Sequence, residues 1–291
     1  GPVILAVVVT VLALVLAQTG ENLWAVALFA AATFAIAIAV QELWRGTRAR
    51  QAMTGLGPAR AFFTLIGRNR RRYGGYLVHI GIAVMFVGVA ASTAFQHSQD
   101  VRLKPGESAT VGGYTFTYAK PTARIAQRSG ELERIELGSI IRVTKDGKPV
   151  TTLEPNRGYY PINAPMMGAI TRYFEGESTS EIGLKAGAMR DLWIAERPDI
   201  SAITPVIKQG DAVFARAARA GVPARTQSLL LGQALRGLVA RYAAKAPPAQ
   251  FRILVSPMVF WLWTGTWIFV IGGPIAAWPG GGLRDRARAR T

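Results

Sequence analysis

Four apolar runs, each of about twenty residues, constrain the fold of this 291-residue chain more than any other feature. The runs are Pro2–Gln18, Leu23–Trp44, Tyr76–Phe95 and Ile253–Trp278. A helix of about twenty residues spans roughly 30 Å of hydrocarbon, so each run is long enough to cross a bilayer. We therefore predict a membrane protein: an α-helical transmembrane bundle of four spans, with a soluble domain inserted before the last span.

Basic residues set the expected orientation of these spans. The link between the second and third runs holds eight arginines and no acid between Arg45 and Arg72, and the C-terminal tail holds four more arginines. Short arginine-rich segments beside membrane helices face the cytoplasm, so we expect the inserted domain to be extracytoplasmic and the C-terminus to be cytoplasmic. The net charge of +17 then reflects the topology of a membrane protein in contact with lipids, and we expect no nucleic-acid partner.

The expected organisation has seven parts. They are two transmembrane helices in 1–44, a basic cytoplasmic link in 45–75, a transmembrane helix carrying His79 in 76–95, a β-rich extracytoplasmic domain in 96–206, a helical, basic juxtamembrane segment in 207–250, the last transmembrane helix in 251–278 and a basic cytoplasmic tail in 279–291. The chain contains no cysteine, which excludes disulfides, thiolate metal ligands and a cysteine nucleophile.

Alternation and turn residues predict strands in the inserted domain. The stretch "YTFTYA" alternates aromatic and small residues, and "SIIRVTKDGKPVTTL" holds two strand-like runs around Asp146-Gly147, a strong hairpin signal. Met189–Trp193 predicts another strand. The segment from Asn156 to Gly168, rich in proline, asparagine and glycine, predicts a loop.

A helical pattern follows in the second half of the inserted segment. Leu231, Leu235, Leu238 and Tyr242 fall on one helical face. This basic amphipathic helix either lies on the lipid surface or packs against the strand domain, and the sequence favours neither.

His79 lies about one turn inside the third apolar run, and an ionisable residue at that depth is by default a functional candidate. Gly75 and Ala83, one turn to either side, leave room for a flat, bulky ligand against the helix. A neutral imidazole in an apolar slot suits haem iron, with its other nitrogen donating to a carbonyl or water, and it also suits a proton relay. His97, just beyond this run, is expected to be solvated.

The opposite flank of the same helix carries Gly74, Gly81 and Gly88 at seven-residue spacing. Small residues at this spacing predict a groove for close packing of a second helix. The acids of the inserted segment, such as Glu175, Glu177 and Glu181, form no recognisable pair, so the sequence indicates no general acid/base couple.

Several stretches together resemble the CcmF family, the haem lyase of bacterial system I cytochrome c maturation. They are "NRRRYGGYLVHIGIAVMFVGVA", "GGYTF", "DGKPVTTLEPNRGYYP", "TSEIGLKAGAMRDLW" and "SPMVFWLWTG". The resemblance covers most of 1–199 and 256–278 and is weakest over 200–250.

This resemblance implies a structural haem b held by two membrane histidines, with His79 at the position of the second. It also implies haem as substrate, delivered by a haem chaperone and attached to apocytochrome c, together with other cytochrome c maturation subunits as partners. The family's tryptophan-rich segment, its first membrane histidine and its two outer histidines are absent from these 291 residues. The second axial ligand is therefore expected outside this chain, in an upstream part of a longer protein or in a separate chain, and a lyase component acts only with that part present.

Two other readings stay open at this point. One is a non-catalytic assembly or binding module of the maturation complex, without a haem of its own. The other is a quinone- or proton-handling membrane subunit. Iron coordination by His79 in the whole protein discriminates between them and the haem lyase.

Overall fold

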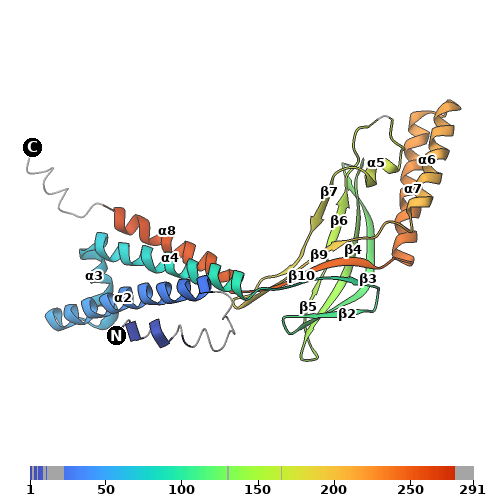
Figure 1. Cartoon of the computed structure of the whole chain (residues 1–291). Coiled ribbons are helices and arrows are strands. Elements are labelled where there is room, and N and C mark those ends of the chain that lie inside the picture. Colours follow the sequence, from blue (N-terminus) through green and yellow to red (C-terminus); the bar gives the residue numbers. More distant parts are fainter. Residues whose placement is uncertain are drawn as a thin grey trace, which may run out of the picture. The chain divides into compact units, whose positions relative to one another are not determined.

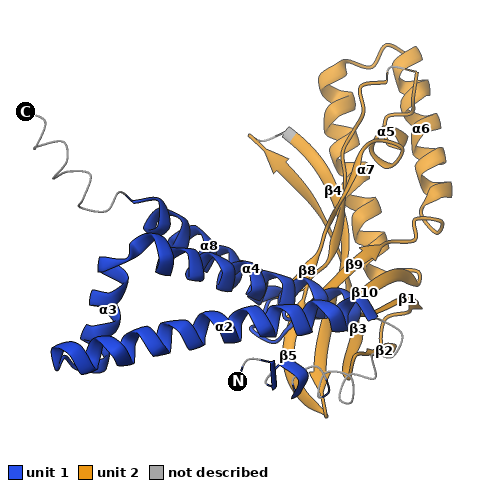
Figure 2. Cartoon of the chain, turned by 60° about the vertical axis from the view of Figure 1, so that its left-hand side comes forward, with its two compact units in different colours: residues 1–96, 186–191, 256–291 blue, residues 97–185, 192–255 orange. Residues whose placement is uncertain are grey.

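A computed structural model describes residues 1, 3–4, 6–8, 11, 23–129, 131–164 and 166–278. The chain divides into two compact units (Figure 2). Unit 1 consists of residues 1–96, 186–191 and 256–291, and unit 2 consists of residues 97–185 and 192–255.

Unit 1 is helical (Figure 1). Its helices are α2 (Leu23–Thr54), α3 (Pro58–Arg68), α4 (Arg70–Ala94) and α8 (Val259–Ala277). Among the described residues, α2, α4 and α8 are long and apolar enough to cross a membrane. The fourth predicted span, Pro2–Gln18, falls largely outside the described residues, so three predicted spans have a matching helix.

The basic link between the spans is itself helical. Helix α2 runs ten residues beyond the predicted end at Trp44 and stops before Gly55, which has a φ of +69°. That left-handed conformation is readily adopted by glycine and ends the helix. Pro58 then begins α3, where a missing N–H costs no helical hydrogen bond.

Helices α4 and α8 pack through glycines, as the seven-residue spacing predicts. A Cβ atom built on Gly74 would lie 2.5 Å from the main-chain nitrogen of Ala276, and one on Gly81 would lie 2.5 Å from that of Phe269. On α8, Cβ atoms built on Gly265 and Gly272 would lie 2.6 Å and 2.8 Å from main-chain atoms of α4. The predicted groove is confirmed, since only glycine permits this approach.

Replacing Gly81 with alanine is therefore expected to destabilise unit 1. The added methyl group overlaps main-chain atoms of α8, which should cost about 1–3 kcal/mol and lower the melting temperature of the purified protein in detergent by several degrees. Gly273→Ala is the matched control on α8, because nothing lies within 4 Å of its Cβ position. Equal melting temperatures for the two variants would contradict this packing.

Unit 2 contains two antiparallel sheets. The first has the order β1 (His97–Leu103), β10 (Ala249–Pro257), β9 (Arg190–Arg197), β8 (Gly183–Lys185). The second has the order β2 (Ser108–Val111), β3 (Tyr114–Arg128), β4 (Glu131–Lys145), β6 (Asn156–Tyr159), β7 (Ser178–Glu181), with β5 (Lys148–Leu153) also paired to β4. The β-rich character predicted for the inserted domain is confirmed.

One hydrophobic core joins the strands of both sheets. Phe116 and Tyr118, the inward residues of the alternating "YTFTYA" stretch, lie in this core with Phe251 and Ile253 of β10. The rings of Tyr118 and Phe251 meet edge to face with centroids 5.2 Å apart. Period-two alternation thus builds the core from both sides.

The hairpin predicted at Asp146-Gly147 joins β4 and β5. Their φ angles are +50° and +74°, and Lys145 pairs with Lys148 across the turn. Positive φ at both central residues is what a two-residue type I′ turn requires.

A second hydrophobic core lies between three helices and residues of strands β3, β4 and β6. The helices are α5 (Thr171–Phe174), α6 (Thr204–Arg219) and α7 (Ala224–Ala244). The face of α7 formed by Leu231, Leu235, Leu238 and Tyr242 is buried in one cluster with Ile135 and Leu137 of β4. The sequence allowed this helix either to lie on the lipid surface or to pack against the strand domain. In the structure it packs against the strands.

The predicted boundary of the last span is wrong at its N-terminal end. Residues 251–257 were assigned to a membrane helix, but Ala249–Pro257 forms strand β10, paired with β1 along its length. Alternate residues from Ala249 to Val255 are buried, so the stretch is an amphipathic strand, and its last apolar residues run directly into the apolar stretch of α8. Met258, with a φ of +58°, separates it from α8.

Candidate functional site

His79 lies on an exposed face of α4 within unit 1. Its Nδ1 atom is 2.8 Å from the main-chain oxygen of Gly75. A carbonyl oxygen only accepts, so this contact puts the ring proton on Nδ1 and leaves the lone pair on Nε2. This contact agrees with the expectation that one ring nitrogen donates to a carbonyl, while the coordination of iron by the other nitrogen stays a prediction.

The two small residues beside His79 differ in their surroundings. No atom lies within 4 Å of the Cβ position of Gly75, so there is free space next to the imidazole. Ala83 is only 3% exposed, so its methyl group is buried and does not line open space beside the imidazole. The open space beside His79 is therefore on the side of Gly75.

This arrangement fits an axial haem ligand. A neutral histidine that donates one ring N–H to a main-chain carbonyl has its tautomer and ring orientation fixed, and the other nitrogen is free to coordinate iron. The apolar side chains nearby suit the face of a porphyrin. Among the described residues, no group of three or more histidine, aspartate or glutamate side chains is placed to hold a metal ion.

His97 occupies a different setting. It opens strand β1 of unit 2, pairs with Val255 and is exposed. No polar partner of its ring is found in the described part of the chain. The expectation that it is a solvated residue agrees with this position.

Sequence reasoning missed a buried carboxyl group in unit 2. Glu196 on β9 is 2% exposed, and its Oε2 accepts a hydrogen bond of 2.5 Å from Ser139 Oγ on β4. Its Oε1 has no partner among the described residues, and the same holds for the hydroxyls of Tyr118 and Tyr242. Burial raises the pKa of Glu196 to about 8, so the carboxyl is largely protonated at neutral pH.

The alternation in β9 carried the signal for this residue. Leu192, Ile194 and Glu196 fall on the same, inward face of the strand. A carboxylate in phase with two buried aliphatic residues is expected to be buried as well. Once a strand is assigned to these residues, the sequence itself predicts that Glu196 is buried.

Comparison with known proteins gives relatives of one kind. No family model matches the chain. Cytochrome c-type biogenesis protein CcmF of Pseudomonas aeruginosa is 26% identical over 259 residues, which is 89% of this chain and 29% of that protein. CcmF of Pseudomonas fluorescens is 30% identical over 177 residues, 60% of this chain and 23% of that protein. Cytochrome c-type biogenesis protein NrfE of Haemophilus influenzae is 32% identical over 124 residues, 42% of this chain and 17% of that protein.

A solved structure agrees at the level of the fold. The structure described as cytochrome c heme lyase CcmF matches with a TM-score of 0.55 and 18% identity, over 96% of this chain and 34% of that one.

The helices, the β-rich domain and the exposed histidine together define a class: a multi-pass membrane protein with a β-rich domain inserted before its last span. Within that class, the chain is similar in sequence to cytochrome c-type biogenesis proteins of the CcmF family, and its fold matches that of a solved CcmF structure. The resemblance seen in the sequence is confirmed. The chain spans less than a third of the length of the curated relatives described above.

Proposed function

We propose that this chain is the C-terminal portion of a membrane haem lyase that attaches haem to apocytochrome c. The observation that carries the proposal is the alignment with a cytochrome c-type biogenesis protein over 89% of the chain, which includes both the helix of His79 and the inserted domain. The exposed imidazole on an apolar helix supports a haem protein over a module that only assembles others.

In this proposal His79 is an axial ligand of a structural haem b, and a residue outside this chain supplies the second ligand. The Gly75 carbonyl holds the imidazole in the tautomer that exposes Nε2. Gly75 gives the porphyrin space beside the imidazole. When bound, the iron supplies a redox centre whose potential depends on these surroundings.

The proposed setting is the bacterial inner membrane, with the inserted domain outside and the C-terminus inside. The arginine-rich segments beside α2 and α4 support this orientation, because positive charges near membrane helices favour the cytoplasmic side. Haem, a haem chaperone, apocytochrome c and other maturation subunits are the proposed substrates and partners.

Deletion of the gene that encodes this chain tests the function. We expect c-type cytochromes to lose their covalently bound haem, seen as lost peroxidase staining after denaturing electrophoresis, while b-type cytochromes keep their spectra. The intact gene should restore the staining. Normal staining in the deletion strain would contradict the proposal and favour a quinone- or proton-handling role.

A further inference from the structure

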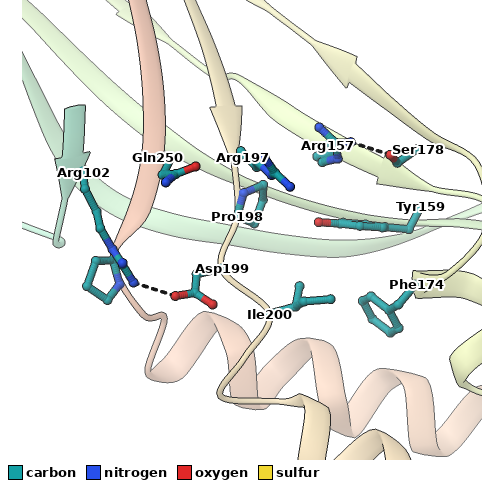
Figure 3. A pocket seen from close by; sticks show the side chains of 11 residues that line it. Arg102, Arg157, Tyr159, Phe174, Ser178, Arg197, Pro198, Asp199, Ile200 and Gln250 are labelled. Carbon is teal, nitrogen blue, oxygen red and sulfur yellow. Dashed lines mark hydrogen bonds and ion pairs between the residues drawn. The ribbon is translucent and has the colours of Figure 1, made fainter. Parts of the chain in front are cut away.

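Unit 2 carries an open pocket of about 510 Å³ (Figure 3). It is lined by residues of β6, by the first residue of β7, by the C-terminal end of β9 and by the N-terminal end of β10. A neighbouring pocket of about 580 Å³ shares Arg102, Arg157, Arg197 and Gln250 with it. We call the two together the arginine groove. Its charged lining residues are Asp100, Arg102, Arg157, Glu196, Arg197, Asp199 and Arg252.

Two of the four arginines are neutralised within the groove. Arg102 Nη2 is 2.7 Å from Asp199 Oδ2, and Arg252 Nε is 3.1 Å from Asp100 Oδ1. The pKa of Asp199 lies below its ordinary value because the carboxylate accepts hydrogen bonds from Ser201, with the charge of Arg102 adding a smaller effect. Both aspartates of the groove are thus already paired with an arginine.

The other two arginines have no carboxylate partner within the described part of the chain. Arg157 donates to the hydroxyls of Ser178 at 2.5 Å and Ser180 at 3.3 Å, which satisfy hydrogen bonds and leave the charge uncompensated. Arg197 is exposed and makes no ion pair within the described ranges. The buried Glu196 does not balance them, because it is turned toward Ser139 and is largely protonated at pH 7.

Both free guanidiniums lie near the Tyr159 hydroxyl. Burial raises the pKa of Tyr159 to about 12, and the positive charges of Arg157 and Arg197 oppose that rise. Figure 3 shows the Tyr159 ring between these arginines and the apolar side chains of Ile200 and Phe174. The pocket therefore offers positive charge on one side and apolar surface on the other.

The groove is also bordered by strand edges that lack neighbours. Strand β8 pairs with β9 only from Leu192 to Ile194, so residues 195–197 have no partner on that side within the described chain. Strand β7 pairs with β6 and, among the described strands, with no other. Strands β7 and β8 belong to different sheets, and the chain passes from one to the other through Ile182. The pockets lie between β7 and the C-terminal end of β9. Free strand edges are sites where an extended chain can add hydrogen bonds.

We propose that the arginine groove binds an extended polypeptide segment that carries acidic side chains. Arg157 and Arg197 bind its carboxylates, an open strand edge pairs with its backbone, and the apolar floor receives a neighbouring side chain. This goes beyond the proposed function, because the groove binds its ligand without haem and without His79.

A peptide is favoured over a small anion by the form of the site. The uncompensated charges come from two different strands, β6 and β9, and the groove continues past them to Arg102 and Arg252. A single small carboxylate engages only part of this surface. A polymer with charges at alternate residues matches it, since side chains of an extended chain repeat on one face every second residue.

The test is binding of a fluorescent peptide of alternating glutamate and threonine to the intact protein in detergent, measured by anisotropy. We expect binding to be at least about tenfold tighter than that of the matching glutamine–threonine peptide and to weaken with salt. Arg157→Gln and Arg197→Gln should each weaken it by about three- to tenfold, and the double variant should bind both peptides equally. Arg142→Gln is the control, since Arg142 is exposed on β4, lies outside the groove and makes no ion pair in the described structure.

Wild-type affinity in the double variant, or equal affinity of the wild type for the two peptides, would overturn the proposal. So would competition by free glutarate at the concentration at which the peptide itself competes, because the groove would then bind a small dicarboxylate. The melting temperatures of the variants confirm that they fold. Since haem-staining of cytochromes is a separate readout, failure of this proposal is distinguishable from failure of the proposed function.

Discussion

His79→Ala is expected to remove most of the haem b that copurifies with the intact protein and most of its cytochrome c maturation. Losing even an outer-shell partner of a metal ligand typically costs 10–100-fold in affinity, so loss of the ligand should lower haem content by about tenfold or more. The measurement is the pyridine haemochrome of purified protein, together with its reduced spectrum. Imidazole added to the variant should restore part of the haem, because the space beside Gly75 is open and the added base replaces the missing ring.

His97→Ala is the matched control, since it removes the other histidine of the chain from an exposed position in unit 2. It should leave haem content and maturation unchanged. Wild-type haem content and an unchanged reduced spectrum in His79→Ala would show that His79 is no ligand. A role in packing or proton handling would then be the better account of that histidine.

The features that the sequence predicted well are those set by local periodicity. The glycines at 74, 81 and 88 share one helical face whatever the partner helix is, so the spacing alone indicated close packing. Asp146-Gly147 indicated the hairpin for a similar reason, because a two-residue turn with positive φ depends on its own residues. In both cases the physical cause lies within a few residues of chain.

The features that were missed depend on partners distant in the sequence. Strand β10 pairs with β1, about 150 residues away, and without that partner "FRILVSP" merges with the apolar run that follows. Arg157 and Tyr159 were placed in a loop because asparagine, proline and glycine surround them. Strand β6 forms there because β4 and β7 both pair with it.

Glu196 gives the last prediction, which concerns how the stability of unit 2 depends on pH. Burial raises the pKa of this carboxyl from an ordinary value of 4.5 to about 8 in the folded chain. Between these two values the folded state holds a proton that the unfolded state has released. The unfolded state therefore binds fewer protons, and the free energy of unfolding falls as the pH rises from about 4.5 to about 8.

The expected size of the effect is large for a single residue. Ionising Glu196 in place costs the folded state at most roughly 5 kcal/mol, since its pKa rises from 4.5 to about 8 and each pKa unit is worth about 1.4 kcal/mol. The hydrogen bond from Ser139 offsets only part of the burial penalty, because Oε1 keeps no partner among the described residues. The hydroxyls of Tyr118 and Tyr242 do not relieve the charge either, since neither makes a hydrogen bond among the described residues.

Urea denaturation of a chain of residues 97–257, followed by the fluorescence of Trp193, measures this dependence, because Trp193 is the single tryptophan of that segment and lies on the same strand. Wild type should lose stability steadily from pH 5 to pH 8.5. Glu196→Gln preserves the shape of the side chain and cannot ionise, so its stability should change much less across that range. Glu154→Gln, at an exposed glutamate, should follow the wild-type curve. Parallel curves for wild type and Glu196→Gln would mean that the pKa of Glu196 is the same in the folded and unfolded states and that another group governs the pH dependence.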